Sequence, residues 1–199
     1  MSSFRSRIYI IDDDEIILWM FKELLRDLDA DLCVFSSAIE FLDAYSPLPS
    51  ECLICDLRMP EIGGLQVQQR LLQAGRHLPI IFVSAHSDVR SAVEAMKQGA
   101  FDFLEKPVNS NLLIEKVQSA LMHSRSMHAQ HLADSTRQAR LSLLTPREVQ
   151  IVELLVAGKS SSQIAEELDL SARTVENHRA RLKEKLHISS TVELIKLFL

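Results

Sequence analysis

The chain contains 199 residues, of which 47% are hydrophobic and 25% are charged, and its formal net charge is −5 at pH 7. This length suits two modest domains or one large domain, and the composition is ordinary for a soluble globular protein. No uninterrupted apolar run approaches the roughly 18–20 residues that a membrane-spanning helix needs. Residues 1–7 also lack the apolar core of a signal peptide. We therefore expect a cytoplasmic protein with no membrane partner.

Charge is distributed unevenly between the two halves of the chain. Residues 1–122 contain 11 Lys and Arg against 18 Asp and Glu, whereas residues 123–199 contain 11 against 9. Within residues 171–187 there are five basic side chains and two acidic ones. An acidic first half followed by a local basic stripe indicates two separate tasks, the second of them on nucleic acid.

The three cysteines, Cys33, Cys52 and Cys55, are an odd number and lie in segments that we expect to be strands. A disulfide framework is therefore not expected. Cys52 and Cys55 form a C-x-x-C pattern, which is also found in redox pairs and in zinc sites. Residues three apart on a strand point to opposite faces, so we predict two buried thiols instead.

The first half of the chain alternates between short apolar runs and helical patterns. Most of the apolar runs are continuous, as expected for strands that are covered on both faces. We predict strands at Arg7–Asp12, Leu32–Phe35, Cys52–Asp56, Pro79–Ser84 and Phe101–Glu105. We predict helices near Glu15–Leu28, Ala38–Tyr45, Leu65–Ala74, Val89–Gln98 and Leu112–Met122. These repeated strand–helix units predict an α/β fold with a doubly wound parallel sheet.

The segment from His123 to Arg140 is polar and has no strong apolar pattern. It contains His123, His128 and His131, which are conceivable metal ligands. No acidic or sulfur-bearing residue is arranged with them, so we favour a solvated helical linker.

From Leu143 onward the sequence predicts helices without strands. The predicted helices are Arg147–Ala157, Ser162–Leu168, Ala172–Leu186 and Thr191–Phe198. Thr145 is a good cap for the first of them, because Pro146 follows at the first helical position and Glu148 stands three residues after the cap. Gly158 fits the end of that helix, and Ser171 fits a cap for the third. A separate all-α domain of four helices is therefore expected.

Polar side chains follow the predicted strands at the points where the strands end. Asp12, Asp13, Asp56, Ser84 and Lys106 should meet at one edge of the sheet, because that is where parallel strands gather their carboxyl ends. Carboxylates there can hold Mg²⁺ through oxygen ligands, and one carboxylate can attack phosphorus to form an acyl phosphate. Each residue alone has an ordinary explanation, as a solvated side chain or a helix cap. Their joint placement favours a phosphoryl-transfer site.

These residues resemble the receiver domain of bacterial two-component response regulators, over roughly residues 5–122. The matching segments are Ile11-Asp12-Asp13, Asp56-Leu57-Arg58-Met59-Pro60, Val83-Ser84-Ala85 and Glu105-Lys106-Pro107. The resemblance implies a flavodoxin-like sheet of five strands in the order 2-1-3-4-5. It also implies that Asp56 accepts a phosphoryl group from a sensor histidine kinase.

The same resemblance implies roles for the residues around Asp56. Mg²⁺ would be bound by Asp13, Asp56 and the backbone carbonyl of Arg58, with Asp12 helping through water. Ser84 and Phe103 match the switch pair of the family, in which some receivers have Tyr where this chain has Phe103. Lys106 matches the phosphate-binding lysine, and a cis Lys106–Pro107 bond is implied.

A different enzyme class also fits part of the acidic cluster. In a haloacid-dehalogenase-type phosphohydrolase, Asp12 would be the nucleophile and Asp14 the acid and base, with Ser84 and Lys106 in supporting roles. Glu15 stands where such enzymes usually carry Thr or Val, their later acidic motif is absent after Lys106, and Asp56 would have no role. We therefore favour the receiver.

In the second half, a predicted helix at 163–168, a short turn and a second helix from Ala172 are typical of a helix-turn-helix unit. The second helix fits the major groove, where Asn can bond adenine, Arg can bond guanine and a methyl group can contact thymine. A small bundle with a charged outer face is the plain alternative. Against it, segments spanning about 141–199 resemble the LuxR/FixJ/NarL DNA-binding domain. Those segments are Leu144-Thr145-Pro146-Arg147-Glu148, Gly158-Lys159, Ile164-Ala165 and the run from Ser171 to His178.

This second resemblance implies which residues contact double-stranded DNA. Base edges would be faced by Glu176, Asn177 and Ala180, whereas phosphates would be contacted by Arg173, Thr174, His178, Arg181 and Lys183. Glu176 could accept a hydrogen bond from cytosine or reject wrong sites. The helix at 191–198 matches the one that pairs two DNA-bound copies.

The resulting expectation is a response regulator of the FixJ/NarL type. It would consist of a receiver (5–122), a helical linker (123–140) and a DNA-binding domain (141–199). Phosphorylation of Asp56 would draw in Ser84 and Phe103, rearrange the surface around 89–98 and favour a homodimer that binds promoter DNA, with RNA polymerase as a further candidate partner. The receiver would catalyse only its own phosphotransfer and dephosphorylation. A factor that binds DNA without phosphorylation is the remaining alternative.

Overall fold

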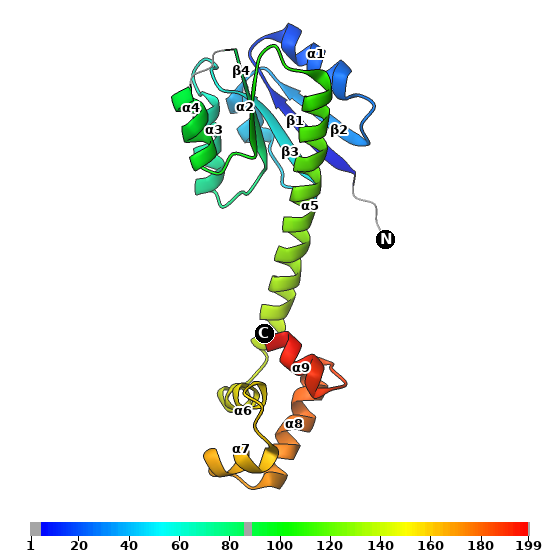
Figure 1. The fold of residues 1–199 in the computed structure, drawn as a ribbon, viewed down its shortest axis with the longest axis vertical. Helices are drawn as coiled ribbons and strands as arrows, with labels where there is room; N and C mark the ends of the chain where they lie inside the picture. Colours follow the sequence, from blue (N-terminus) through cyan, green and yellow to red (C-terminus); the bar gives the residue numbers. More distant parts are fainter. Residues whose placement is uncertain (1–4, 86–88, 199) are drawn as a thin grey trace. The chain divides into compact units, whose positions relative to one another are not determined.

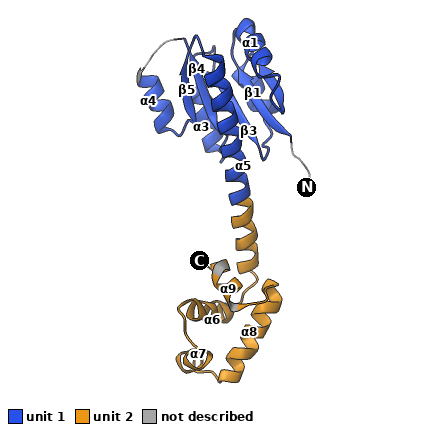
Figure 2. Ribbon diagram, turned by 45° about the vertical axis from the view of Figure 1, so that its right-hand side comes forward, with its two compact units in different colours: residues 1–130 blue, residues 131–199 orange. Residues whose placement is uncertain are grey.

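The structure is a computed structural model that describes residues 5–85 and 89–198. The chain divides into two compact units, with the boundary between Gln130 and His131 (Figure 1, Figure 2). Within the part of the chain that the structure describes, no helix is both long enough and apolar enough to cross a membrane.

The first unit is a parallel sheet with helices on both faces (Figure 1). Its strands are β1 (Ser6–Ile11), β2 (Ala30–Phe35), β3 (Glu51–Asp56), β4 (Ile80–Ser84) and β5 (Asp102–Glu105). Its helices are α1 (Glu15–Leu25), α2 (Ala38–Ala44), α3 (Gly64–Gln73), α4 (Val89–Lys97) and the start of α5 (Ser110–Leu141). The strand order is β2-β1-β3-β4-β5, and every pair is parallel. The predicted doubly wound fold and strand order are confirmed.

Alternate residues of each strand belong to different hydrophobic cores. Ile8 and Ile10 of β1 pack with α1 and α5, whereas Tyr9 and Ile11 pack with α2 and α3. Cys52 and Cys55 follow the same rule and lie in opposite cores as free thiols. Burial raises the pKa of both thiols above the usual range, which suits inert core residues. The predicted buried thiols are confirmed.

The register of the strands aligns their carboxyl ends. Ile11 pairs with Cys55, so the residue after β1 lies beside the last residue of β3. Ser84, at the end of β4, pairs with Glu105 at the end of β5. The backbone N–H of Lys106 continues this ladder by donating to the Ser84 carbonyl oxygen over 2.8 Å. Four strands therefore deliver their last residues to one edge of the sheet.

Two predicted helices end more than one residue away from their predicted ends. α1 ends at Leu25 and not at Leu28, because the chain turns there with the Leu28 N–H donating to the Leu25 carbonyl over 3.0 Å. This turn leaves Leu28 packed against the core while the chain enters β2. The helix predicted to end at Met122 continues to Leu141 as one helix with the linker segment. No Gly or Pro interrupts that stretch.

Polar contacts hold α5 against the sheet beyond Met122. The Ser124 hydroxyl accepts the Glu51 N–H over 3.1 Å. The Arg125 guanidinium donates to the hydroxyls of Ser6 and Ser50 over 2.7 and 2.9 Å. These partners are far from Arg125 in the sequence, so no local pattern identified them.

The second unit contains the remainder of α5 and four further helices. These are α6 (Pro146–Val156), α7 (Ser161–Glu167), α8 (Ala172–Leu186) and α9 (Thr191–Phe198). Thr145 caps α6 in a reciprocal capping box with Glu148, and the Ser171 hydroxyl caps α8 by accepting the Thr174 N–H. Gly158 follows α6 at φ +81°, where a side chain would be strained. The predicted caps and helix stop are confirmed.

One apolar core joins α6, α7, α8 and α9. Its buried members are Ile151, Val152, Leu155, Ile164, Ala165, Val175, Leu182, Leu186 and Leu194. Leu168 and Leu170 pack at its edge, in the turn between α7 and α8. This packing fixes α8 relative to α7, as a helix-turn-helix unit requires.

Candidate functional site

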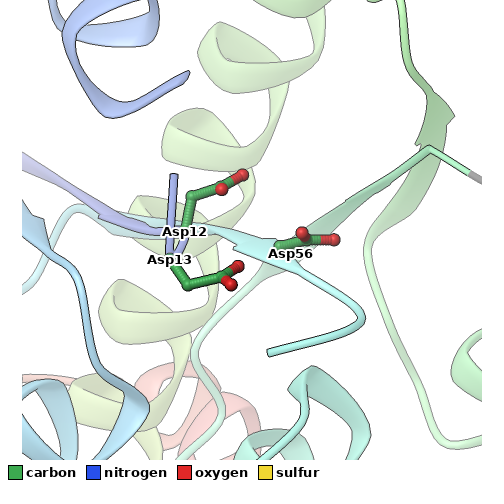
Figure 3. A group of neighbouring side chains, drawn as sticks. All are labelled: Asp12, Asp13 and Asp56. Carbon is green, nitrogen blue, oxygen red and sulfur yellow. The ribbon is translucent and has the colours of Figure 1, made fainter. Parts of the chain in front are cut away.

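Three carboxylates meet at the carboxyl edge of the sheet. Asp12 and Asp13 follow β1 and Asp56 ends β3, and oxygens from all three lie within 4.8 Å of one another (Figure 3). Asp12 is 1% exposed, Asp56 is half-buried and Asp13 is exposed. The cluster is therefore anchored in the protein on one side and open to solvent on the other. Such a set of oxygen ligands fits a hard divalent cation.

Lys106 connects two of these carboxylates. Its Nζ lies 2.7 Å from Asp12 Oδ2 and 3.3 Å from Asp56 Oδ2. The three residues come from the ends of β1, β3 and β5, and the Lys106 side chain is 16% exposed. One ammonium does not neutralise three carboxylates, so the site keeps a net negative charge that a metal ion can balance.

Burial and hydrogen bonding oppose each other at Asp12. Burial raises the pKa of this carboxyl group, whereas hydrogen bonds from Lys106 and from the Asp14 N–H lower it, and the net direction is upward. For Lys106, burial lowers the pKa, but the hydrogen bond and charge of Asp12 more than offset it, so the pKa is raised. Lys106 therefore carries a full positive charge at neutral pH, next to the carboxylates of Asp12 and Asp56.

Ser84 and Phe103, the predicted switch pair, lie on the neighbouring strands β4 and β5. Ser84 is 2% exposed, and Phe103 is half-buried against the core that contains Tyr9 and Ile11. The Lys106–Pro107 peptide bond is cis, as the resemblance implied. The structure therefore places Ser84 at the carboxylate edge and Phe103 on the adjacent strand, two residues before that strand ends, and their switching role stays a prediction.

The Asp14 carboxylate is used as a helix cap and is not part of the carboxylate cluster. Its carboxylate accepts the Ile16 N–H over 2.8 Å and caps α1. The backbone N–H of Asp14 donates to Asp12 Oδ1 over 3.0 Å, which helps to orient the Asp12 carboxylate. Asp14 thus starts the helix and does not occupy the acid and base role of a phosphohydrolase.

Gly64 is a further site residue, which no motif in the sequence singled out. A Cβ at this position would lie 2.5 Å from the Asp56 carbonyl oxygen and 2.8 Å from Phe82 Cε1. α3 can start directly beneath Asp56 only because residue 64 has no side chain. No local pattern in the sequence indicated this close approach.

The predicted DNA-contacting residues are all on α8, with different exposure. Arg173, Glu176, Asn177, Ala180 and Arg181 are exposed. Thr174, His178 and Lys183 are half-buried, and the Thr174 hydroxyl lies 2.7 Å from the hydroxyl of the cap residue Ser171. Val175 and Leu182 face the core. α8 therefore has a polar outer surface, and DNA contact by its individual residues stays a prediction.

Glu176 has partners that sequence reasoning did not identify. Its Oε1 accepts hydrogen bonds from the Ser161 hydroxyl at the start of α7 and from Arg179 Nη1, the latter over 3.0 Å. Arg179 Nη1 also donates to the Ser161 hydroxyl over 2.6 Å. The i, i+3 spacing of Glu176 and Arg179 was a possible signal for their pairing, whereas nothing local pointed to Ser161.

Two family models match the chain, one for each unit. The response regulator receiver domain matches residues 8–118. The family described as bacterial regulatory proteins, luxR family, matches residues 142–198. The first match contains the carboxylate edge, and the second contains α7 and α8.

Curated proteins are similar over almost the whole chain. It is 38% identical to the transcriptional regulatory protein TdiR of Thauera aromatica, over 96% of this chain and 84% of TdiR. It is 37% identical to the transcriptional regulatory protein FixJ of Bradyrhizobium diazoefficiens, over 97% of this chain and 94% of FixJ. Both matches therefore extend over the two units of this chain.

Solved structures show the same similarity. The response regulator StyR matches with a TM-score of 0.88 and 31% identity, covering 98% of both chains. Full-length FixJ from B. japonicum matches with a TM-score of 0.61 and 36% identity, covering 98% of this chain and 96% of that one. The phosphohydrolase and the plain charged bundle, the alternatives open from sequence, are not supported by these matches.

Proposed function

Because the chain belongs to the two-component response regulators with a LuxR-type DNA-binding domain, we propose that Asp56 is the residue that accepts the phosphoryl group. The chain regulates transcription in a phosphorylation-dependent way, and its family implies a histidine kinase and DNA as partners. The observation that supports Asp56 is the position of Lys106, whose ammonium contacts both Asp56 and the buried Asp12.

The proposed reaction follows from the contacts of Asp56. A carboxylate oxygen of Asp56 attacks phosphorus, the phosphorus–nitrogen bond of a phosphohistidine breaks, and an acyl phosphate forms on Asp56. Lys106, with its raised pKa, stays protonated and stabilises the negative charge that the phosphoryl oxygens carry. Asp12 holds Lys106 in place over 2.7 Å. The receiver would thus catalyse its own phosphorylation. It would also catalyse its own dephosphorylation, in which water attacks the same phosphorus.

Mg²⁺ is the cofactor that fits this cluster. Asp13, Asp56 and the backbone carbonyl of Arg58 are the proposed ligands, with Asp12 acting through water. Three carboxylates with oxygens within 4.8 Å of one another support the assignment, since Mg²⁺ is bound by oxygen ligands and retains water. When bound, the ion neutralises charge on the transferred phosphoryl group.

We propose that the acyl phosphate is read out by the neighbouring strands and helices. Ser84 would move toward the phosphate and Phe103 would turn inward, which changes the surface of α4 and β5. Val93 and Met96 on α4 are each 46% exposed, so an apolar surface is available for a second copy. A homodimer, paired on DNA through α9, places two α8 helices about one turn of DNA apart. Promoter occupancy then depends on phosphorylation because each half-site alone is weak.

We also propose where this regulation takes place and which further partner takes part in it. Promoter DNA and a sensor kinase domain meet in the cytoplasm, and RNA polymerase is a candidate partner of the DNA-bound dimer. The domain boundaries that we propose are a receiver at 5–122, a linker at 123–140 and a DNA-binding domain at 141–199.

The test compares Asp56→Asn with Asp14→Asn. Asn caps helices as well as Asp does, so the second variant keeps the cap on α1 and changes charge by the same amount near the site. The full chain is incubated with acetyl phosphate and Mg²⁺, and intact mass, sedimentation and DNA binding are measured. We expect a mass increase of one phosphoryl group, dimer formation and tighter DNA binding for wild type and Asp14→Asn, and none of these for Asp56→Asn.

Other outcomes would contradict specific parts of the proposal. A phosphoryl group on Asp12 would restore the phosphohydrolase alternative. Phosphodonor-dependent DNA binding by Asp56→Asn would refute the coupling between Asp56 and the DNA-binding domain. Equal DNA binding by wild type with and without phosphodonor would favour the phosphorylation-independent factor.

A further inference from the structure

Glu176 is an exposed acidic residue on a helix whose other outward charges are mostly basic. Its side chain is 59% exposed, yet one of its two carboxylate oxygens is fixed by hydrogen bonds. Both hydrogen bonds that the structure records for it are accepted by Oε1, from Ser161 and from Arg179. Arg179 also bonds Ser161, so the three side chains form a closed triangle that joins α7 to α8. Among the described residues, Oε2 takes no hydrogen bond.

We infer that Ser161 and Arg179 are positioning residues that hold the Glu176 carboxylate so that its Oε2 accepts a hydrogen bond from a cytosine of the target DNA. This inference rests on the proposed role of α8 as the helix that enters the major groove. It assigns a part in base recognition to Ser161 on α7 and Arg179 on α8, neither of which is among the residues expected to face bases.

The choice of cytosine follows from the chemistry of the groove. An ionised carboxylate accepts hydrogen bonds and donates none. Cytosine presents its N4 amine in the major groove, whereas guanine and thymine present acceptor atoms that repel a carboxylate. Adenine has an N6 amine but also the N7 acceptor beside it. Cytosine is therefore the base that a fixed carboxylate tolerates best.

The triangle also keeps the carboxylate ionised and ordered. The hydrogen bond from Ser161 lowers the pKa of Glu176, and the positive charge of Arg179 lowers it further. A free glutamate side chain loses rotamer entropy when it binds, and this cost is smaller when the folded domain has already fixed its position. The side chain is thus prepared to discriminate between bases and not only to add affinity.

The test measures base preference and not affinity alone. The full chain, treated with acetyl phosphate, selects from a pool of duplexes randomised over about one and a half turns of DNA, and the base frequencies at each position are read. We expect wild type to prefer cytosine at one position of each half-site by about tenfold. Glu176→Ala removes that preference, and Glu176→Gln shifts it to adenine, which an amide can bond in bidentate fashion.

Variants of Ser161 separate positioning from folding. Ser161→Ala should reduce the cytosine preference to about threefold or less, while Ser161→Thr, which keeps the hydroxyl, retains it. Ser162→Ala is the matched control, because this exposed neighbour is outside the triangle and should leave the preference unchanged. A merely structural role of Ser161 would lower affinity equally for all sequences, and that result would overturn the inference.

The outcomes also distinguish this inference from the proposed function. If wild type selects no sequence at all, sequence-specific DNA binding by α8 fails and the inference fails with it. If wild type selects a sequence but Glu176→Ala selects the same one, only the role of Glu176 is refuted.

Discussion

The two units of this protein gather charged side chains in opposite ways. In the first unit, Lys106 meets Asp12 from 94 positions away and Asp56 from 50 positions away. In the second unit, the charged residues that we expect to contact DNA lie on the single helix α8 (Ala172–Leu186). The first arrangement depends on the register of several strands, and the second depends mainly on the periodicity of one helix.

This difference determines how each site should respond to mutation. Groups that share contacts within one small cluster are energetically coupled, so the loss of one changes the others. Side chains spread along a helix are further apart and should contribute more independently. We therefore expect large effects that depend on neighbours at the carboxylate edge, and small additive effects on the outer surface of α8.

Replacement of Lys106 is expected to have the largest effect. In Lys106→Ala, the rate of phosphorylation by acetyl phosphate should fall on the order of 100-fold, because the ammonium that stabilises phosphoryl charge is lost. Affinity for Mg²⁺ should rise, since one positive charge is removed from beside Asp12 and Asp56. Rates are measured by intact mass and Mg²⁺ affinity by calorimetry.

Lys116→Ala provides the control for Lys106. Lys116 pairs with Asp102 over 2.8 Å in the same unit, so the variant removes the same charge outside the carboxylate cluster. Phosphorylation and Mg²⁺ binding should stay near wild type. Equal slowing by both variants would mean that net charge, and not convergence at one site, controls the reaction.

An intermediate effect is expected at Glu148, a buried carboxylate that pairs with the exposed Lys185 within the second unit. Glu148 accepts hydrogen bonds from Thr145 and from Lys185 Nζ, the latter over 2.8 Å. Glu148→Gln should lower the free energy of local unfolding by about 1–2 kcal/mol, because a charge-assisted hydrogen bond is lost. Hydrogen exchange of amides in α6 and α8, measured on the full chain, reports this change. Glu153→Gln, an exposed change on the same helix, should have little effect.

The same ion pair predicts a pH dependence with a definite sign. Burial raises the pKa of Glu148, but the hydrogen bonds from Lys185 and Thr145 outweigh it, so the pKa is lowered overall. Its stabilising contribution is therefore complete above the ordinary glutamate pKa of about 4.3, and it disappears as the pH falls through the lowered value. Exchange protection in wild type should decline over that range, and the difference from Glu148→Gln should vanish at the acid end. If the difference in exchange protection between wild type and Glu148→Gln stayed the same at every pH, the assignment of this pH dependence to Glu148 would be contradicted.

The smallest effect is expected for one basic residue on the outer surface of α8. Arg181→Ala should weaken DNA binding several-fold for all sequences and reduce the slope of log affinity against log salt by about 1. Titrations at several salt concentrations measure this slope. Arg140→Ala on α5 makes the same charge change outside α8 and should leave the slope unchanged. A change in base preference in Arg181→Ala would contradict the expectation that Arg181, unlike Glu176, contributes to affinity and not to base preference.

Sequence reasoning succeeded where local patterns carry the information. Continuous apolar runs located every strand of the sheet, and cap signals at Thr145 and Ser171 located helix starts. It was less accurate at helix ends, as with α1, whose apolar pattern continues to Leu28 although the helix stops at Leu25. Apolar periodicity records which side chains are buried, and a turn can bury Leu28 as well as a helix can.

The sequence by itself therefore determined the fold class, the carboxylate and lysine set at the strand ends, and the helix-turn-helix unit. These depend on periodicity, on caps and on the rule that parallel strands collect their carboxyl ends at one edge. Only the tertiary structure decided the contacts of Lys106 with Asp12 and Asp56, the lack of space for a Cβ at Gly64, and the triangle of Ser161, Glu176 and Arg179. Distances between side chains from different elements depend on strand register and helix packing, which no local pattern encodes.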